Sequence, residues 1–195
     1  MQPKTVGVSL VVCWGVLIAI AFWLFAYKDL RLFADDEVFA RFPEEVASTA
    51  ISTSPLPENA TGRLVNFWNP DCRCSRFSQA HIEEIMQAYA GQGIEFVVAV
   101  PRQSLVDQAL TTFPKASSAV VVEQLEGLST PSAAVFDARS TLVYFGPYSD
   151  GAFCTSGGST PVELILNDVV APGEVAPWLN LSAFGCYCDW PTARS

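Results

Sequence analysis

The sequence contains few basic residues and only one histidine. Lysine and arginine together number 11 against 20 aspartates and glutamates, so the 195-residue chain has a formal net charge of -9. The basic residues form no cluster, whereas a protein that binds nucleic acid needs a positive face opposite the phosphates. We therefore expect no nucleic-acid partner.

The sequence also lacks internal repeats and the polar composition of a disordered chain. Half of its residues are hydrophobic and 12% are aromatic, whereas disordered segments are poor in both. About 165 residues follow the apolar N-terminal segment, which is enough for one domain with its own core.

Charge is absent from the N-terminal stretch from Val6 to Tyr27. As a helix its 22 residues would span about 33 Å, which is enough to cross a bilayer core. A cleaved signal peptide has a shorter apolar core and a small-residue cleavage site, and the residues before Cys13 are not the small ones expected ahead of a lipidated cysteine. We predict an uncleaved membrane anchor over residues 1–28.

The orientation of this anchor is judged from its flanks and from the cysteines. Lys4 precedes the apolar stretch, while Lys28, Arg31 and Arg41 follow it, a distribution that slightly favours a cytoplasmic C-terminal domain. The cysteines favour the opposite side, because disulfides persist in oxidising compartments. We give the cysteines more weight and expect the domain outside the cytoplasm.

Six cysteines are present, and Cys13 lies within the anchor. Five cannot all pair within one chain, so in an oxidising compartment at least one thiol stays free or bonds to a partner. The five that follow the anchor are Cys72, Cys74, Cys154, Cys186 and Cys188.

Hydrophobic periodicity divides the rest of the chain into a helix and linker over residues 29–62, a domain over 63–172 and a tail over 173–195. The order β-α-β-α-(β)-β-β-α, in which the last two strands form an antiparallel hairpin, predicts an α/β fold. In the first domain helix, Phe77, His81, Ile85 and Tyr89 form an apolar row. We expect strands at residues 63–68, 94–100, 119–122, 132–136 and 141–145, and helices at 72–89, 103–113 and 160–170.

The run LVNFW, followed four positions later by Cys72, resembles the thioredoxin-like fold. The likeness is to its membrane-anchored bacterial branch, which handles disulfides and cytochrome c thiols outside the cytoplasm. Thr130 and Pro131, which precede a strand, resemble the cis-proline loop of that family. The resemblance covers about residues 63–170 and implies a mixed sheet flanked by helices, with an N-terminal transmembrane helix.

The resemblance implies that Cys72 is the nucleophilic cysteine and that Thr130 and Pro131 bind the substrate strand. Independently, a helix N-terminus lowers the pKa of a thiol through its unpaired N–H groups and the helix dipole. In the family motif Cys-x-x-Cys the second cysteine would stand at Ser75, but the nearest thiol here is Cys74. We predict Cys72 and Cys74 as catalytic residues, with Cys74 as the resolving partner.

The spacing of these two cysteines leaves other pairings open. Side chains two apart in a helix point about 200° away from each other, so a Cys72–Cys74 bond needs a distorted first turn. Cys72 can instead pair with Cys154, or with Cys186 or Cys188 if the tail returns over the active face. These three are therefore possible resolving or structural cysteines.

We predict that the chain exchanges thiols and disulfides with extracytoplasmic protein partners. The resemblance places it in a bacterial inner membrane, as a single-pass protein with a periplasmic domain. No cofactor is implied, because thiol exchange moves electrons through sulfur alone. Two alternatives remain: a site where the two Cys-x-Cys pairs bind zinc or copper through thiolates, and a catalytically inactive thioredoxin-fold binding scaffold.

Overall fold

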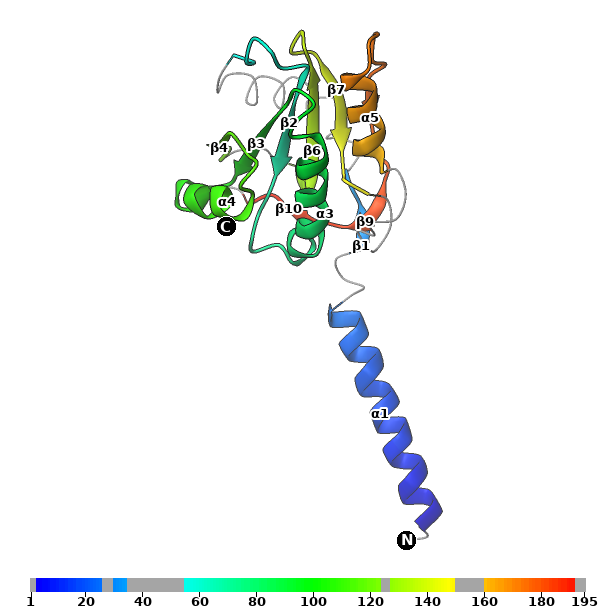
Figure 1. The fold of residues 1–195 in the computed structure, drawn as a ribbon. Coiled ribbons are helices and arrows are strands. Elements are labelled where there is room, and N and C mark those ends of the chain that lie inside the picture. Colours follow the sequence, from blue (N-terminus) through cyan, green and yellow to red (C-terminus); the bar gives the residue numbers. More distant parts are fainter. Residues whose placement is uncertain (1–2, 26–29, 35–54, 124–126, 150–159, 192–195) are drawn as a thin grey trace.

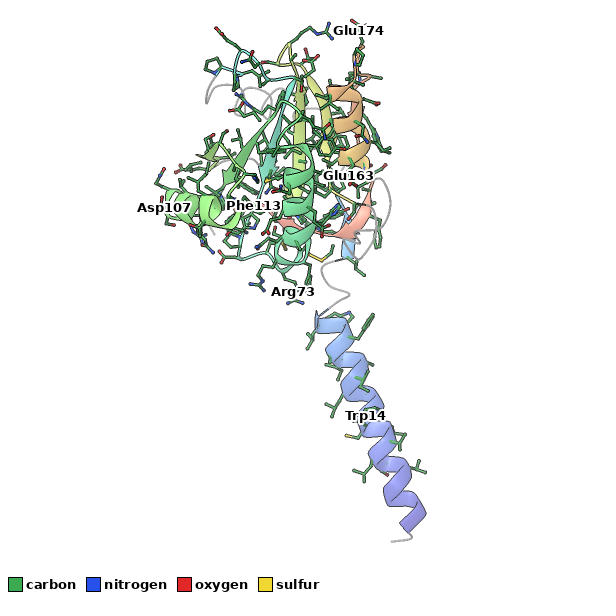
Figure 2. All side chains as sticks on the ribbon, viewed as in Figure 1. Trp14, Arg73, Asp107, Phe113, Glu163 and Glu174 are labelled. Atoms are coloured by element: carbon green, nitrogen blue, oxygen red, sulfur yellow. A yellow bond between two sulfur atoms is a disulfide. The ribbon has the colours of Figure 1, made fainter. Side chains whose placement is uncertain are left out.

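The computed structural model describes residues 3–25, 30–34, 55–123, 127–149 and 160–191. Helix α1 (Pro3–Phe25) stands apart from the rest of the chain in Figure 1. Its segment Gly7–Leu24 has a mean hydropathy of 2.4 and is 0% buried, and apolar side chains such as Trp14 project from it (Figure 2). Length and composition allow this helix to cross a membrane, and a signal sequence meets the same criteria.

A six-stranded sheet in the order β4-β3-β2-β6-β7-β8 forms the centre of the domain (Figure 1). Strands β2, β3 and β4 are parallel, β6 and β7 form the predicted antiparallel hairpin, and β8 runs parallel to β7. Strands β2, β3 and β6 are largely buried, which explains their continuous apolar runs. The strands are β2 (Gly62–Phe67), β3 (Ile94–Val100), β4 (Ser118–Val121), β6 (Ser132–Asp137), β7 (Leu142–Gly146) and β8 (Trp178–Leu179).

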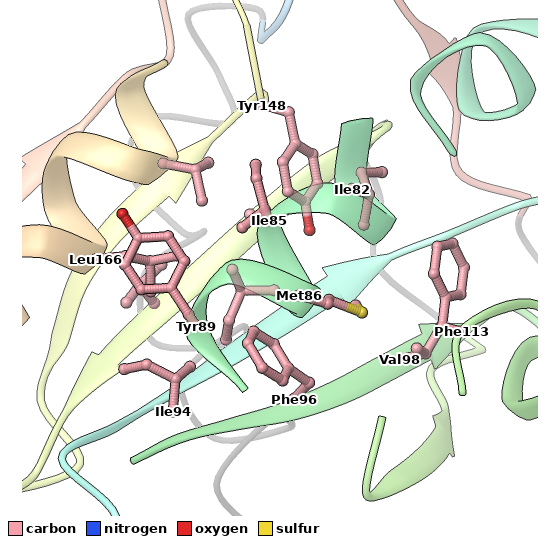
Figure 3. Close-up of a cluster of buried hydrophobic side chains, with 14 of the residues drawn as sticks. Ile82, Ile85, Met86, Tyr89, Ile94, Phe96, Val98, Phe113, Tyr148 and Leu166 are labelled. Atoms are coloured by element: carbon pink, nitrogen blue, oxygen red, sulfur yellow. The ribbon is translucent and has the colours of Figure 1, made fainter. Parts of the chain in front are cut away.

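Three helices contribute to the core on one face of this sheet. They are α3 (Arg73–Tyr89), α4 (Val106–Thr112), which follows the 3-10 turn η3 (Gln103–Leu105), and α5 (Pro161–Val170). Figure 3 shows Met86 and Tyr89 of α3 turned toward Phe96 and Ile94 of β3. The start of α5 has a capping box, in which Thr160 and Glu163 bond reciprocally to backbone N–H groups. The predicted α/β class and element order are confirmed.

The opposite face of the sheet is covered by segments from both ends of the chain. Strand β1 (Leu30–Leu32) pairs antiparallel with β9 (Phe184–Cys186), and β10 (Cys188–Asp189) pairs antiparallel with β5 (Ser129–Thr130). Buried residues from these segments form a second core with the sheet: Phe33, Leu181, Ala183, Tyr187 and Trp190. The apolar tail is thus packed, as its composition predicted.

Two local predictions need correction. The helix expected from residue 29 is wrong at Leu30–Leu32, which form a strand because they pair with the tail; residues 35–54 of that prediction lie outside the described residues. Phe77 is 70% exposed rather than part of the buried row. A row with four-residue spacing rotates by about 40° at each step, so Phe77 has turned away from the core side that Ile85 occupies.

Candidate redox site

Cys72 is the N-cap of α3, five residues beyond the last residue of β2. Its Sγ accepts a hydrogen bond from the backbone N–H of Ser75, with the two atoms 3.5 Å apart. In the loop before the helix, Asn69 Oδ1 accepts a hydrogen bond from the N–H of Asp71. An N–H donor and the positive end of a helix dipole both stabilise a thiolate at Cys72 when it is reduced.

The structure joins each cysteine of the α3 pair to a cysteine of the tail. Cys72 bonds to Cys188 and Cys74 bonds to Cys186, with Cα atoms 5.9 and 5.6 Å apart respectively. The expected Cys72–Cys74 pairing is therefore not the one formed. Although the sulfurs of Cys72 and Cys74 lie within 4.8 Å of each other, each bonds to a tail cysteine, so the alternative of a returning tail holds. Cys154 lies outside the described residues.

The Thr130–Pro131 peptide bond is cis, as the resemblance implied, and Thr130 lies beside Cys72. The Sγ of Cys72 is 3.6 Å from the carbonyl oxygen of Thr130. The Thr130 hydroxyl donates to the Phe67 carbonyl at 2.9 Å. It must therefore accept from Ser75, whose Oγ is also 2.9 Å away. The residue that replaces the second motif cysteine thus fixes the loop against α3, a role that the sequence did not reveal.

The tail forms a strand against this same loop. Cys188 lies opposite Thr130 and Asp189 opposite Ser129 in the antiparallel pairing of β10 with β5. Arg31 binds both partners, because its guanidinium is 2.6 Å from an Asp189 carboxylate oxygen and 3.1 Å from Ser129 Oγ. The predicted substrate-binding loop is therefore occupied by the protein's own C-terminal segment.

Exposure differs between the two ends of each disulfide. Cys72 and Cys74 are 3% and 1% exposed, while Cys186 and Cys188 are partly exposed. A thiol in solution therefore has easier access to the tail cysteines than to Cys72 and Cys74. The sequence predicted the helix cysteines as reactive but gave no signal for this order of access.

Charged groups surround the start of α3. Figure 2 shows Arg73 projecting from it, and Asp71 forms an exposed ion pair with Arg102 at 2.7 Å. Because Arg102 binds this carboxylate, Asp71 offsets less of the positive charge of Arg73. His81 is buried on α3, in agreement with the prediction that it packs in the core rather than acting as a base for Cys72.

The site and fold together define a protein with a thioredoxin-like fold. The supporting features are the mixed sheet, the cysteine that caps the first domain helix and the cis-proline loop before β6. Within that class, the chain belongs to the family described as a domain of unknown function, DUF6436, whose model matches residues 43–190.

Solved structures give a similar picture of the fold. A hypothetical protein from Sinorhizobium meliloti is 17% identical with a TM-score of 0.52, covering 68% of this chain and 81% of its own. An uncharacterized conserved protein from Geobacillus kaustophilus is 14% identical with a TM-score of 0.56, covering 69% and 79%. The thioredoxin domain of a thiol-disulfide oxidoreductase from Bacteroides vulgatus has 14% identity and a TM-score of only 0.35, covering 43% and 68%. No curated protein matches the sequence.

Proposed function

We propose that this chain exchanges disulfides with cysteine-bearing protein partners through the Cys72–Cys188 pair. The observation that carries the proposal is the register of β10, which sets Cys188 opposite Thr130 while its sulfur bonds to Cys72. The tail thereby presents Cys188 to a partner cysteine, in the way that strand addition presents a peptide. Thr130 and Pro131 hold the backbone of the tail segment that carries it.

The reaction begins from the oxidised protein at the tail, because Cys188 is more accessible than Cys72. A partner thiolate attacks Cys188 Sγ, a mixed disulfide forms there, and Cys72 leaves as a thiolate. The Ser75 N–H that faces Cys72 Sγ stabilises this leaving group, and a thiol of lower pKa leaves faster. The partner's second thiolate then attacks its own sulfur in the mixed disulfide and releases Cys188. The partner dithiol is oxidised and the Cys72–Cys188 pair is reduced.

Cys74 acts as a second electron carrier in this proposal rather than as the first resolving thiol. Its sulfur lies within 4.8 Å of those of Cys72 and Cys188. A Cys188 thiolate can attack Cys74 Sγ and release Cys186, and Cys72 can then attack Cys188 and release Cys74. The first disulfide re-forms and the second is reduced, so electrons pass from one pair to the other without leaving the protein.

Helix α1 holds the domain at the periplasmic face of a bacterial inner membrane in this proposal. Support comes from its uncharged span and from the disulfides, which require an oxidising compartment. A reporter active only in the periplasm, fused after Ser195, is expected to work. Activity of a cytoplasm-specific reporter at that position would overturn the orientation.

Trapping of partners tests the exchange reaction. In Cys72→Ser, the Cys188 thiol can still attack the disulfide of an oxidised partner, which is the reverse of the reaction above, but no Cys72 thiol remains to release the partner from the mixed disulfide. This variant is therefore expected to accumulate mixed disulfides visible on non-reducing gels from native cells. Cys188→Ser is expected to trap fewer, because Cys72 is buried beneath the tail. The reverse ranking would restore Cys72 as the first attacking thiol, as the sequence suggested.

The matched control for this trap is the double variant Cys72→Ser, Cys188→Ser. It retains the Cys74–Cys186 bond that holds the tail but lacks both exchanging sulfurs, so it should trap no partner. Equal trapping by the double variant, or none by either single variant, would overturn exchange at this pair. A folded protein with that result would then be better explained as a binding scaffold.

A further inference from the structure

Three sulfur atoms of the redox site form a compact group. The Sγ atoms of Cys72, Cys74 and Cys188 all lie within 4.8 Å of one another. A metal–sulfur bond of about 2.3 Å places the sulfurs of a trigonal site about 4 Å apart, so the sulfurs of Cys72 and Cys188, which are bonded to each other in the structure, must separate to that distance on reduction. Both disulfides must open before these atoms can bind a metal, since each of the three is oxidised in the structure.

The tail has anchors on the N-terminal side of its cysteines that do not depend on sulfur. Strand β9 pairs with β1, so that Gly185 lies opposite Arg31. Tyr187, between the two tail cysteines, is buried with its ring 5.2 Å from that of Phe33. These contacts persist when the disulfides are reduced.

Trp190 provides a further anchor just beyond Cys188. Its side chain is buried, and its ring lies 5.8 Å from that of Phe67. Its indole N–H donates to the Val122 carbonyl and its backbone N–H to the Leu128 carbonyl, each at 2.8 Å. Because Cys188 is held between Tyr187 and Trp190, reduction should leave its sulfur facing the start of α3.

The helix side of the group is equally fixed. Cys72 caps α3 and Cys74 is in its first turn, and the Ser75 N–H faces the Cys72 sulfur. Thiolates are soft ligands and select copper(I) or zinc. Structural zinc sites take four ligands, whereas copper(I) is satisfied by three thiolates. The fourth cysteine, Cys186, does not belong to the compact group.

We propose that the fully reduced protein binds one copper(I) ion through the thiolates of Cys72, Cys74 and Cys188. Two equivalents of a dithiol reductant open the two disulfides, each dithiol being oxidised as one protein disulfide gains two electrons. The three ligand thiols then lose three protons as the ion binds. The site exists only in the reduced state, and it does not depend on the exchange of disulfides with partners.

Titration of the reduced, full-length chain in detergent with copper(I), without oxygen and against a copper(I) chelator, tests the proposal. All samples carry Cys13→Ser and Cys154→Ser, so that only the four cysteines of the two disulfides remain. We expect one ion per chain, with three sulfur ligands by X-ray absorption. The oxidised protein should bind at least 100-fold more weakly.

Single replacements then identify the ligands. Cys188→Ser should weaken copper(I) binding at least 100-fold, while Cys186→Ser should change it less than threefold. Trp190→Ala should also weaken binding, although all ligands remain, because it removes an anchor of the tail. Tryptophan fluorescence and circular dichroism verify that each variant is folded.

Several outcomes would overturn the site. They are failure of the reduced protein to compete for copper(I), binding that survives Cys188→Ser, or an equal need for Cys186. Stoichiometric zinc bound in preference to copper(I), with loss on replacement of any of the four cysteines, would also contradict the three-thiolate assignment. The trapping of partners can succeed or fail whatever the copper(I) titration shows, because trapping is measured in cells without added metal.

Discussion

The two faces of the sheet are held in different ways. On one face, α3, α4 and α5 bury side chains against the strands in a continuous apolar core. On the other face, the covering strands β1, β9 and β10 are only two or three residues long. Two disulfides join β9 and β10 to the start of α3. We call these the helix face and the tail face.

Isolated strand pairs of this length are not stable by themselves in water. The tail face therefore relies on its cross-links and on a few large side chains such as Trp190 and Phe33. The difference indicates that the proposed redox site lies on the face that we expect to be the less stable of the two. Opening the disulfides should lower the local stability of the tail face, although the contacts of Tyr187 and Trp190 still hold the tail in place, while the helix face keeps its stability, since local opening need not involve the whole domain.

The largest expected effect comes from a cavity on the helix face. Phe96 is buried between β3 and α3, so Phe96→Ala should lower the free energy of unfolding by about 3–5 kcal/mol. Denaturant unfolding should show a similar loss in oxidised and reduced protein, because no disulfide reaches this core. Phe77→Ala, on the exposed side of α3, is the control and should change stability by less than about 0.5 kcal/mol. A loss confined to the reduced protein would contradict the separation of the faces.

The next effect concerns the tail face itself. Removing one disulfide through Cys74→Ser with Cys186→Ser should cost less than about 2 kcal/mol, because the remaining disulfide still closes nearly the same loop; the two span 116 and 112 residues. Loss of the second disulfide as well should cost about 2–4 kcal/mol more, because the long loop is then open in the unfolded chain. Hydrogen exchange should then show faster exchange in β9 and β10 than in α3. Uniform loss of protection across both faces would contradict this prediction.

The helix face could be predicted well from the sequence, because its elements depend on local patterns. Strand β3 has the predicted bounds, and β2, β6 and β7 differ by one residue at most at either end. The cap at Thr160 follows from its spacing to Glu163. Likewise, the cysteine after the first strand and the Thr-Pro pair before the hairpin were sufficient to predict that Cys72 and Thr130 meet.

The tail face could not be predicted, because its strands are too short to have a period. Leu30–Leu32 and Phe184–Cys186 become strands only by pairing across the length of the chain. The disulfide pattern follows from that pairing, since only the returned tail brings Cys188 to Cys72. Helix geometry argued against a Cys72–Cys74 bond, but it did not show whether Cys72 pairs with Cys154 or with one of the tail thiols.

The dependence of stability on acid pH should also distinguish the two faces, because the titrating carboxylate, that of Asp137, lies in the sheet rather than in the tail. Burial alone would raise the pKa of Asp137, but hydrogen bonds from the Thr141 and Arg139 N–H groups and from the Arg139 guanidinium lower it overall. A depressed folded-state pKa means that the carboxylate contributes stability above its unfolded pKa near 4. That contribution is lost as the pH falls through the lower folded value.

Asp137→Asn should therefore destabilise the domain on the order of 1 kcal/mol at neutral pH. The amide oxygen can still accept from the two N–H groups, which are 2.8 and 2.9 Å from Oδ1 in the wild type, but the pair with Arg139 is lost. Chemical denaturation at pH 7 and in the acid range provides the measurement. The gap between variant and wild type should close in acid, and a gap that is constant with pH would contradict the role of the charge.

The smallest effect is expected at the ion pair between the two ends of the chain. Arg31 and Asp189 have side chains 36% and 83% exposed, so Asp189→Asn should cost only about 0.2–1 kcal/mol. The loss should appear as faster hydrogen exchange in β10 at low salt and should shrink in concentrated salt, which screens exposed charges. The amides of α5 serve as the internal control and should not respond. A larger effect that persists at high salt would mean that the Asp189 carboxylate holds the tail more strongly than an exposed ion pair does. The tail face would then depend less on its disulfides than the comparison of the two faces implies.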